Sequence, residues 1–117
     1  MELRHLRYFV VAAQLEHFGR AAARLAIVQP ALSRQIGELE EELGVSLFER
    51  LARGVRLTAA GRAFLAEAEA LLARAGEASE RVRDVAAGRA GRLRIGFVDT
   101  AVYGPTLPRL LQSFRRK

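Results

Sequence analysis

The sequence contains no cysteine, no tryptophan and only two histidines among its 117 residues. Without cysteine, a disulfide framework and a thiolate metal site are excluded. His5 and His17 stand alone, with no acidic partner at a catalytic or metal-binding spacing, so we interpret both as structural or surface residues. The sequence also has no P-loop, no Ser-His-Asp or Cys-His set and no group of metal ligands. We therefore predict a protein that is not an enzyme and that binds no metal or cofactor.

Long hydrophobic runs are also absent. No stretch of eighteen consecutive apolar residues occurs, and the chain begins directly with an amphipathic pattern. A transmembrane helix needs about twenty predominantly apolar residues, and a signal peptide needs an apolar segment behind a basic start. The sequence therefore predicts a cytoplasmic protein without a membrane partner.

The net charge of +6 is unevenly distributed. Residues 1–57 have eight arginines against seven glutamates, whereas residues 93–117 have five basic residues against Asp99 alone. A basic total favours a polyanionic partner, but most of this excess lies near the end of the chain. The pattern around residues 29–43 is more informative, because arginines flank its start and four glutamates crowd its end: Glu38, Glu40, Glu41 and Glu42.

Residues 22–44 predict a short helix, a tight turn and a second helix. In the second helix, leucine or isoleucine recurs at gaps of four, three and four, at Leu32, Ile36, Leu39 and Leu43. This spacing is typical of one buried helical stripe. Pro30 suits the first turn of that helix, and Gly44 suits its end. The preceding helix is expected over about residues 20–25, and a first helix over about residues 2–16.

The start of the second helix carries the candidate DNA-binding residues. The residues around it that lie off the buried stripe are small or can form hydrogen bonds, namely Gln29, Pro30, Ala31, Ser33 and Arg34. A helix anchored by one face, with short polar groups and an arginine at its N-terminal end, suits the major groove of DNA. Taken without further context, the same residues also fit an ordinary helix surface.

Residues 45–58 predict a small β-hairpin, or wing. Two β-prone segments, at about 47–49 and 55–57, flank a turn at residues 52–54. Arg50, Arg53 and Arg56 are expected on this hairpin, where they suit phosphates or the minor groove. Arg50 has an alternative interpretation, in which it pairs with Glu49 or with a helix end.

The segment after Thr58 predicts a helix of about thirty residues, with Thr58 as its N-cap. Its apolar residues follow a heptad pattern, with alternating gaps of four and three and one flanking leucine: Phe64, Ala68, Leu71, Leu72, Ala75, Ala78, Val82 and Val85. A heptad seam normally packs against a partner helix, so we predict a homodimer through this helix. In the alternative, the seam packs back on its own domain.

Residues 89–117 predict the start of a further domain. A hinge-like segment at 88–92 is followed by a β-prone strand at 93–98, a loop and an amphipathic helix at 106–116. A single β-α unit is not a domain, so we interpret it as the truncated opening of an α/β domain. The expected organisation is mainly α: a winged helix-turn-helix at 1–58, a dimerisation helix at 59–88, and the hinge with the truncated β-α start at 89–117.

This combination resembles the N-terminal part of LysR-type transcriptional regulators. The matching segments are LRHLRYFV at 3–10, AAARL at 21–25, QPALSRQIGELEEELGVSLFER at 29–50 and RGVRLTAAG at 53–61. The resemblance implies a winged helix-turn-helix that binds double-stranded DNA at inverted-repeat operators, and a dimer that forms tetramers in the full-length protein. It also implies a small-molecule effector, bound by the C-terminal domain that this chain lacks.

Two positions depart from the usual pattern of the family. Val28 stands where a serine commonly caps the recognition helix, and Gly19 stands where threonine or serine commonly opens the preceding helix. Both helices are therefore expected to lack a hydroxyl cap. A residue other than serine before Gln29 is also similar to the branch that regulates the catabolism of aromatic compounds.

Two other classes of function fit parts of the sequence. The chain also fits a dimeric coiled coil whose helical head binds protein without DNA specificity. A self-contained, ligand-sensing winged-helix dimer fits the sequence less well, because the alanine-rich seam offers little room for a ligand pocket.

Overall fold

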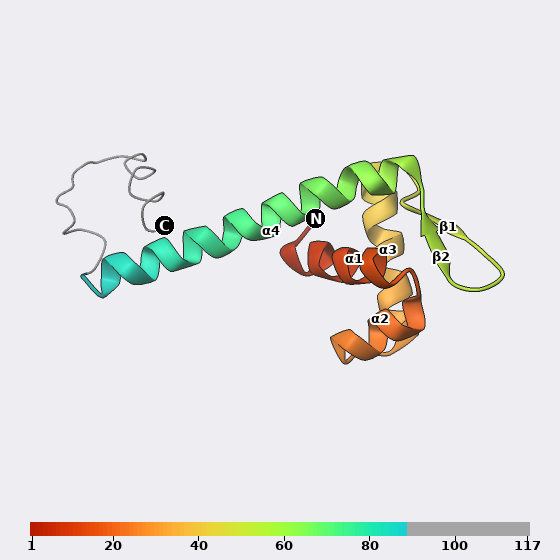
Figure 1. The fold of residues 1–117 in the computed structure, drawn as a ribbon, viewed down its shortest axis with the longest axis horizontal. Helices are drawn as coiled ribbons and strands as arrows, with labels where there is room; N and C mark the ends of the chain where they lie inside the picture. Colours follow the sequence, from red (N-terminus) through yellow and green to blue (C-terminus); the bar gives the residue numbers. More distant parts are fainter. Residues whose placement is uncertain (89–117) are drawn as a thin grey trace. The chain divides into compact units, whose positions relative to one another are not determined.

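The structure, a computed structural model, describes residues 1–88 (Figure 1). The elements are α1 (Leu3–Leu15), α2 (Phe18–Leu25), α3 (Gln29–Leu43), β1 (Phe48–Arg50), β2 (Val55–Leu57) and α4 (Ala59–Ala86). This mainly helical arrangement with one small hairpin confirms the winged helix-turn-helix with a long helix. The predicted strand at 93–98 and helix at 106–116 lie outside the described residues.

The residues Met1–Arg74 form one compact unit, which we call the head, and the described residues from Ala75 to Gly88 belong to a second unit. In the head, α1 packs against α2 and α3, and α2 packs against α3. Three residues of the predicted stripe of α3 are buried, because Leu32, Ile36 and Leu39 are each at most 1% exposed, and the fourth, Leu43, is partly buried against the same core. Alanines at the buried positions of α2 let the crossing helices approach closely.

Aromatic rings join the helices to the hairpin. The Phe9 ring lies 5.5 Å from that of Phe48 and 5.1 Å from that of Phe64, both in tilted contacts. The Phe18 ring meets that of Phe48 edge-on at 5.2 Å. Such pairs contribute about 0.5–1.5 kcal/mol beyond their buried area. Phe9, Phe18 and Phe48 all belong to the core, since none is more than 6% exposed.

Helix α2 begins earlier than predicted, at Phe18 and not near Arg20, because His17 caps it. The His17 Nδ1 atom accepts the Arg20 N–H at 3.0 Å. Gly19 makes this possible, because a Cβ atom at that position would lie 2.9 Å from the imidazole Cε1. The helix therefore has a cap, supplied by an imidazole in place of a hydroxyl group.

The other histidine also caps a helix. The His5 Nδ1 atom accepts the Glu2 N–H at 3.0 Å, which completes a capping box at the start of α1. The His5 ring is buried between helices, with its Nε2 atom 3.5 Å from a Glu38 carboxylate oxygen. The interpretation of both histidines as structural or surface residues agrees with these contacts.

The wing, defined as β1, β2 and the turn between them, is antiparallel, with Phe48 paired to Leu57 and Arg50 paired to Val55. Its first strand begins one residue later than predicted. The turn closes through the Leu51 N–H, which donates to the Gly54 carbonyl at 3.2 Å. Gly54 has a φ of +77°, and a Cβ atom there would lie 2.7 Å from the Glu16 carbonyl oxygen. Glycine is therefore required where the wing touches the end of α1.

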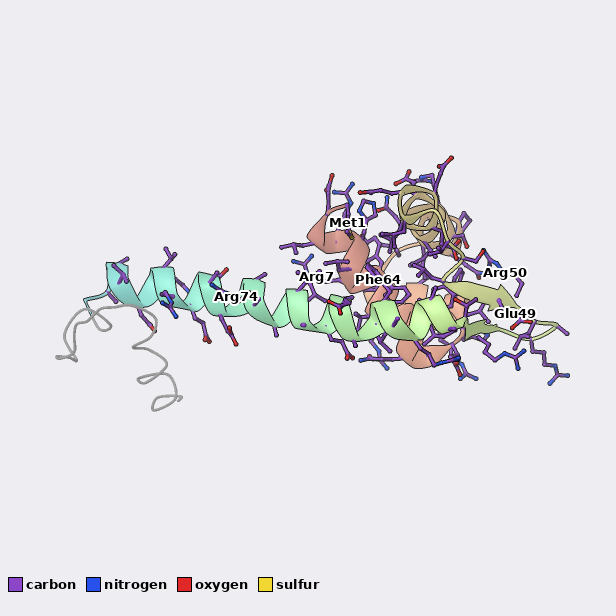
Figure 2. All side chains as sticks on the ribbon, turned by 90° about the horizontal axis from the view of Figure 1, so that it is seen from above. Met1, Arg7, Glu49, Arg50, Phe64 and Arg74 are labelled. Carbon is purple, nitrogen blue, oxygen red and sulfur yellow. The ribbon has the colours of Figure 1, made fainter. Side chains whose placement is uncertain are left out.

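Helix α4 begins as predicted, with the Thr58 Oγ1 atom accepting the Gly61 N–H at 2.9 Å. The predicted seam needs one correction, because Ala68 is 0% exposed and belongs to the core of the head. Phe64 and Leu72 also pack against that core, and Figure 2 shows Phe64 on the part of α4 that lies along the head. The packing of this part on its own domain therefore follows the alternative interpretation.

Among residues 1–88, none of the helices combines the length and the apolarity that crossing a membrane requires.

Candidate nucleic-acid interface

The N-terminal end of α3 presents the residues predicted to read DNA. Gln29, Pro30 and Arg34 are exposed, whereas Ala31 and Ser33 are half-buried. The opposite stripe is fixed in the core, so this end of the helix is held rigidly while its outer face stays accessible. Rigid support matters because base recognition depends on the accurate placement of short side chains.

The start of α3 is capped by backbone alone. Val28 is the N-cap residue and has no side-chain cap hydrogen bond, as predicted. Its carbonyl accepts the N–H groups of Ala31 at 3.0 Å and Leu32 at 3.2 Å, while Pro30 has no N–H to satisfy. The Val28 side chain is 68% exposed, so it contributes little to the core.

We expect Val28→Ser to raise the free energy of unfolding by a few tenths to about 1 kcal/mol. A serine hydroxyl at this position adds a second acceptor for the Ala31 N–H beside the residue-28 carbonyl, and an exposed valine is lost at little cost. DNA binding is expected to tighten as well, because the hydroxyl can also donate to a phosphate. Thermal unfolding of Val28→Ser, with Val28→Ala as the control that gains no hydroxyl, measures the effect. A serine variant no more stable than the alanine variant contradicts this account of the cap.

A surface hollow of about 200 Å³ lies beside the start of α3. It is formed where the start of α2, the start of α3 and the wing meet, and its lining residues are His17, Phe18, Gly19, Gln29, Arg50, Leu51, Gly54 and Val55. The fold thus brings together Gln29 and Arg50, two of the predicted DNA-binding residues.

Among residues 1–88, Arg50 contacts an aromatic ring and pairs with no acid. Its guanidinium carbon lies 4.8 Å from the centre of the Phe18 ring, within the range of a cation–π contact. The neighbouring Glu49 pairs instead with Arg56, at 3.0 Å between carboxylate oxygen and Nη2. Figure 2 shows Glu49 and Arg50 on the wing. The alternative in which Arg50 pairs with Glu49 is therefore wrong, and the charge of Arg50 stays directed to the hollow.

The other predicted residues lie apart from the hollow. Arg53 is exposed in the turn of the wing, between β1 and β2. Of the residues predicted for dimerisation and not packed on the head, Leu71 is 46% exposed, Val82 67% and Val85 61%. Ala78 is also exposed, and Ala75 is half-buried.

The sequence pattern did not predict two side chains that hold the backbone around the candidate interface. His17 lines the hollow and caps α2, a role that is hard to predict because histidine is not among the preferred capping residues. Glu40 was counted only as one of four acidic residues, yet its carboxylate bonds to the backbone at the start of the wing. Its place one residue after the buried Leu39 was the only available signal.

Comparison with known proteins places the site in a family context. A family profile described as "Bacterial regulatory helix-turn-helix protein, lysR family" matches residues 3–62. The HTH-type transcriptional regulator BudR of Klebsiella aerogenes is 49% identical over 115 residues, which are 98% of this chain and 80% of that protein. The uncharacterized HTH-type transcriptional regulator YnfL of Escherichia coli (strain K12) is 49% identical over 116 residues. That match spans 99% of this chain but only 39% of the length of YnfL.

A solved structure is similar to the described fold. The crystal structure of the BenM_DBD/catB site 1 DNA complex superposes with a TM-score of 0.75 and 44% sequence identity. The match covers 79% of this chain and 99% of that chain. That domain was crystallised with DNA, and nearly the whole length of that domain is matched by this chain.

Proposed function

Since the chain belongs to the LysR family of bacterial regulatory helix-turn-helix proteins and carries the family's DNA-binding domain, we propose that it binds an inverted-repeat operator sequence-specifically as a homodimer. In this proposal α3 enters the major groove, and its first turns read the bases. Gln29, Ser33 and Arg34 supply the hydrogen-bonding groups, while Pro30 and Ala31 keep the helix end narrow enough to approach.

The observation that carries the proposal is the two-sided character of α3. One stripe is almost completely buried, and the opposite side of its N-terminal end exposes Gln29 and Arg34. The acidic residues lie at the C-terminal half, so negative charge is kept away from the end that would meet the phosphates. A helix that only completed the core would need neither feature.

The hollow beside α3 supports a second kind of contact. We assign to Arg50 a backbone phosphate next to the groove that α3 occupies, because its guanidinium is held on Phe18 without an acidic partner among the described residues. Arg53, in the turn of the wing, is assigned a phosphate or the adjacent minor groove. These contacts position the protein, whereas the α3 contacts specify the sequence.

The dimer in this proposal forms through the part of the α4 seam that is not packed on the head, namely Leu71, Ala75, Ala78, Val82 and Val85. Two heads related by a twofold axis present two recognition helices to the two halves of an inverted repeat. In a full-length protein we expect tetramers and a small-molecule effector bound by a C-terminal domain, as the resemblance to the family implies.

Selection of bound duplexes from a random library, followed by titration with salt, tests the proposal. We expect an inverted-repeat consensus and an affinity that falls steeply with salt, because phosphate contacts release counterions. Arg34→Ala is expected to cost roughly 1–3 kcal/mol and to relax the preference at one base per half-site. Arg7→Ala, which removes an exposed arginine of α1, is the control and should keep the consensus.

Two outcomes would contradict the proposal. An Arg34→Ala protein with wild-type affinity and an unchanged consensus would remove α3 from base reading. A shallow dependence on salt and no consensus for the wild type would favour the protein-interaction module instead.

A further inference from the structure

The carboxylate of Glu40 links the recognition helix to the wing. Its Oε2 atom accepts the Leu47 N–H at 2.7 Å and the Phe48 N–H at 3.2 Å. Glu40 lies in the C-terminal half of α3, whereas Leu47 precedes the first strand of the wing and Phe48 begins it. One side chain therefore ties the backbone of the wing to the helix proposed to read DNA.

These two hydrogen bonds lie in a place where they are hard to replace. The side chains of Leu47 and Phe48 are 1% and 6% exposed, and the two bonds are part-buried. Bonds from N–H groups to a carboxylate are roughly twice as strong as those between neutral groups. A buried N–H that loses its acceptor carries a desolvation penalty, so the segment would shift to find another partner.

The wing itself is too short to hold its own position. Each strand has three residues, and an isolated two-stranded hairpin is at best marginally stable in water. Its second strand has a separate anchor, because the Val55 N–H donates to the Glu16 carbonyl at 3.2 Å. The first strand packs on α1 and α2 through Phe48, but its bond to α3 is made by Glu40, which therefore links the wing directly to the recognition helix.

We propose that Glu40 is a positioning residue for DNA binding, which aligns the wing with α3 so that Arg53 and Arg34 engage one duplex together. This inference rests on the proposed function. It assigns to Glu40 no contact with DNA, and its effect on binding passes through the wing. The prediction is therefore a selective one: loss of Glu40 removes the contribution of Arg53 and leaves that of Arg34 intact.

A double-mutant cycle on the full chain tests the inference, with a duplex carrying the selected consensus at 0.15 M salt. Arg53→Ala alone should weaken binding about 5-fold per half-site, the counterion-release value for one phosphate, and so about 25-fold for the dimer. In a Glu40→Ala background the same substitution should weaken binding less than about 2-fold per half-site, because a displaced wing makes no contact to lose. Arg34→Ala should weaken DNA binding by the same factor with and without the Glu40→Ala substitution.

Two control variants separate positioning from charge. Glu41→Ala removes the same charge from the neighbouring, exposed position of α3 and should leave the Arg53 factor at about 5-fold per half-site. Glu40→Gln keeps a side-chain oxygen that can accept both N–H groups, so it should restore the Arg53 factor. If Glu40→Ala does not fold, Glu40→Asp takes its place, since its shorter side chain cannot reach both groups.

The inference is overturned if Arg53→Ala costs the same factor with and without the Glu40 carboxylate. It is also overturned if Arg53→Ala has no effect in the wild type, because there is then no wing contact to position, or if Glu40→Gln behaves like Glu40→Ala. Failure of the proposed function looks different: the wild type itself then shows no consensus and no steep salt dependence.

Discussion

Replacing Leu71 by lysine is expected to separate the proposed dimer into monomers and to abolish binding to a full inverted-repeat operator. Leu71 is 46% exposed in the single chain and is absent from the residues packed on the core of the head. Burial of one leucine side chain contributes about 1.5–3 kcal/mol, and a symmetric dimer buries two. Dimerisation should therefore weaken at least about 100-fold, while the head stays folded. Sedimentation equilibrium and operator binding measure the two effects.

The control for Leu71→Lys is Ala73→Lys, which adds the same charge two residues further along α4. Ala73 is exposed and lies off the heptad seam, so its variant should stay dimeric. A chain ending at Gly88 keeps the whole helix and should also stay dimeric. A dimeric Leu71→Lys protein refutes the seam, and a monomeric chain ending at Gly88 moves the interface to residues 89–117.

Those features of the head that depend on local periodicity were predicted well. The spacing of Leu32, Ile36 and Leu39 identified the buried stripe of α3, because residues three and four apart share one face of a helix. Pro30 and Gly44 marked the two ends of the helix, and Thr58 marked the start of α4. Each of these signals acts within a few residues, so the sequence alone carries it.

Contacts between distant segments could not be predicted. The ring of Phe18 that holds Arg50 belongs to α2, so the cation–π contact depends on how the wing folds back on that helix. The bonds from Glu40 to the backbone depend on the path of the loop after Gly44. The cap from His17 depends on the space that Gly19 leaves for an imidazole. No short sequence pattern predicts any of these three contacts.

The heptad pattern of α4 was ambiguous for a related reason. Apolar residues at gaps of three and four show that one side of a helix is covered, but not by what. The structure covers Ala68 completely with the head and leaves Val82 and Val85 exposed. One continuous pattern therefore serves the core in its first part, and only the later part is available to a partner.

Gly61→Ala is expected to destabilise the head by about 3 kcal/mol, near the upper end of the usual cost of overpacking. A Cβ atom at Gly61 would lie 2.1 Å from the Leu47 carbonyl oxygen and 2.9 Å from the Leu57 Cδ2 atom. The Leu47 backbone cannot move aside easily, because its carbonyl accepts the Thr58 N–H at 3.0 Å and its own N–H donates to Glu40. The melting temperature should fall by roughly 10 °C or more.

Gly37→Ala is the matched control, because it makes the same substitution inside a helix of the same head. A Cβ atom at Gly37 meets nothing within 4 Å, so the better helix propensity of alanine should stabilise this variant by about 0.5–1 kcal/mol. The two substitutions thus have opposite expected signs, and the difference measures the contact between α4 and the backbone before the wing. If Gly61→Ala melts at or above the wild-type temperature, α4 does not approach Leu47 this closely in solution.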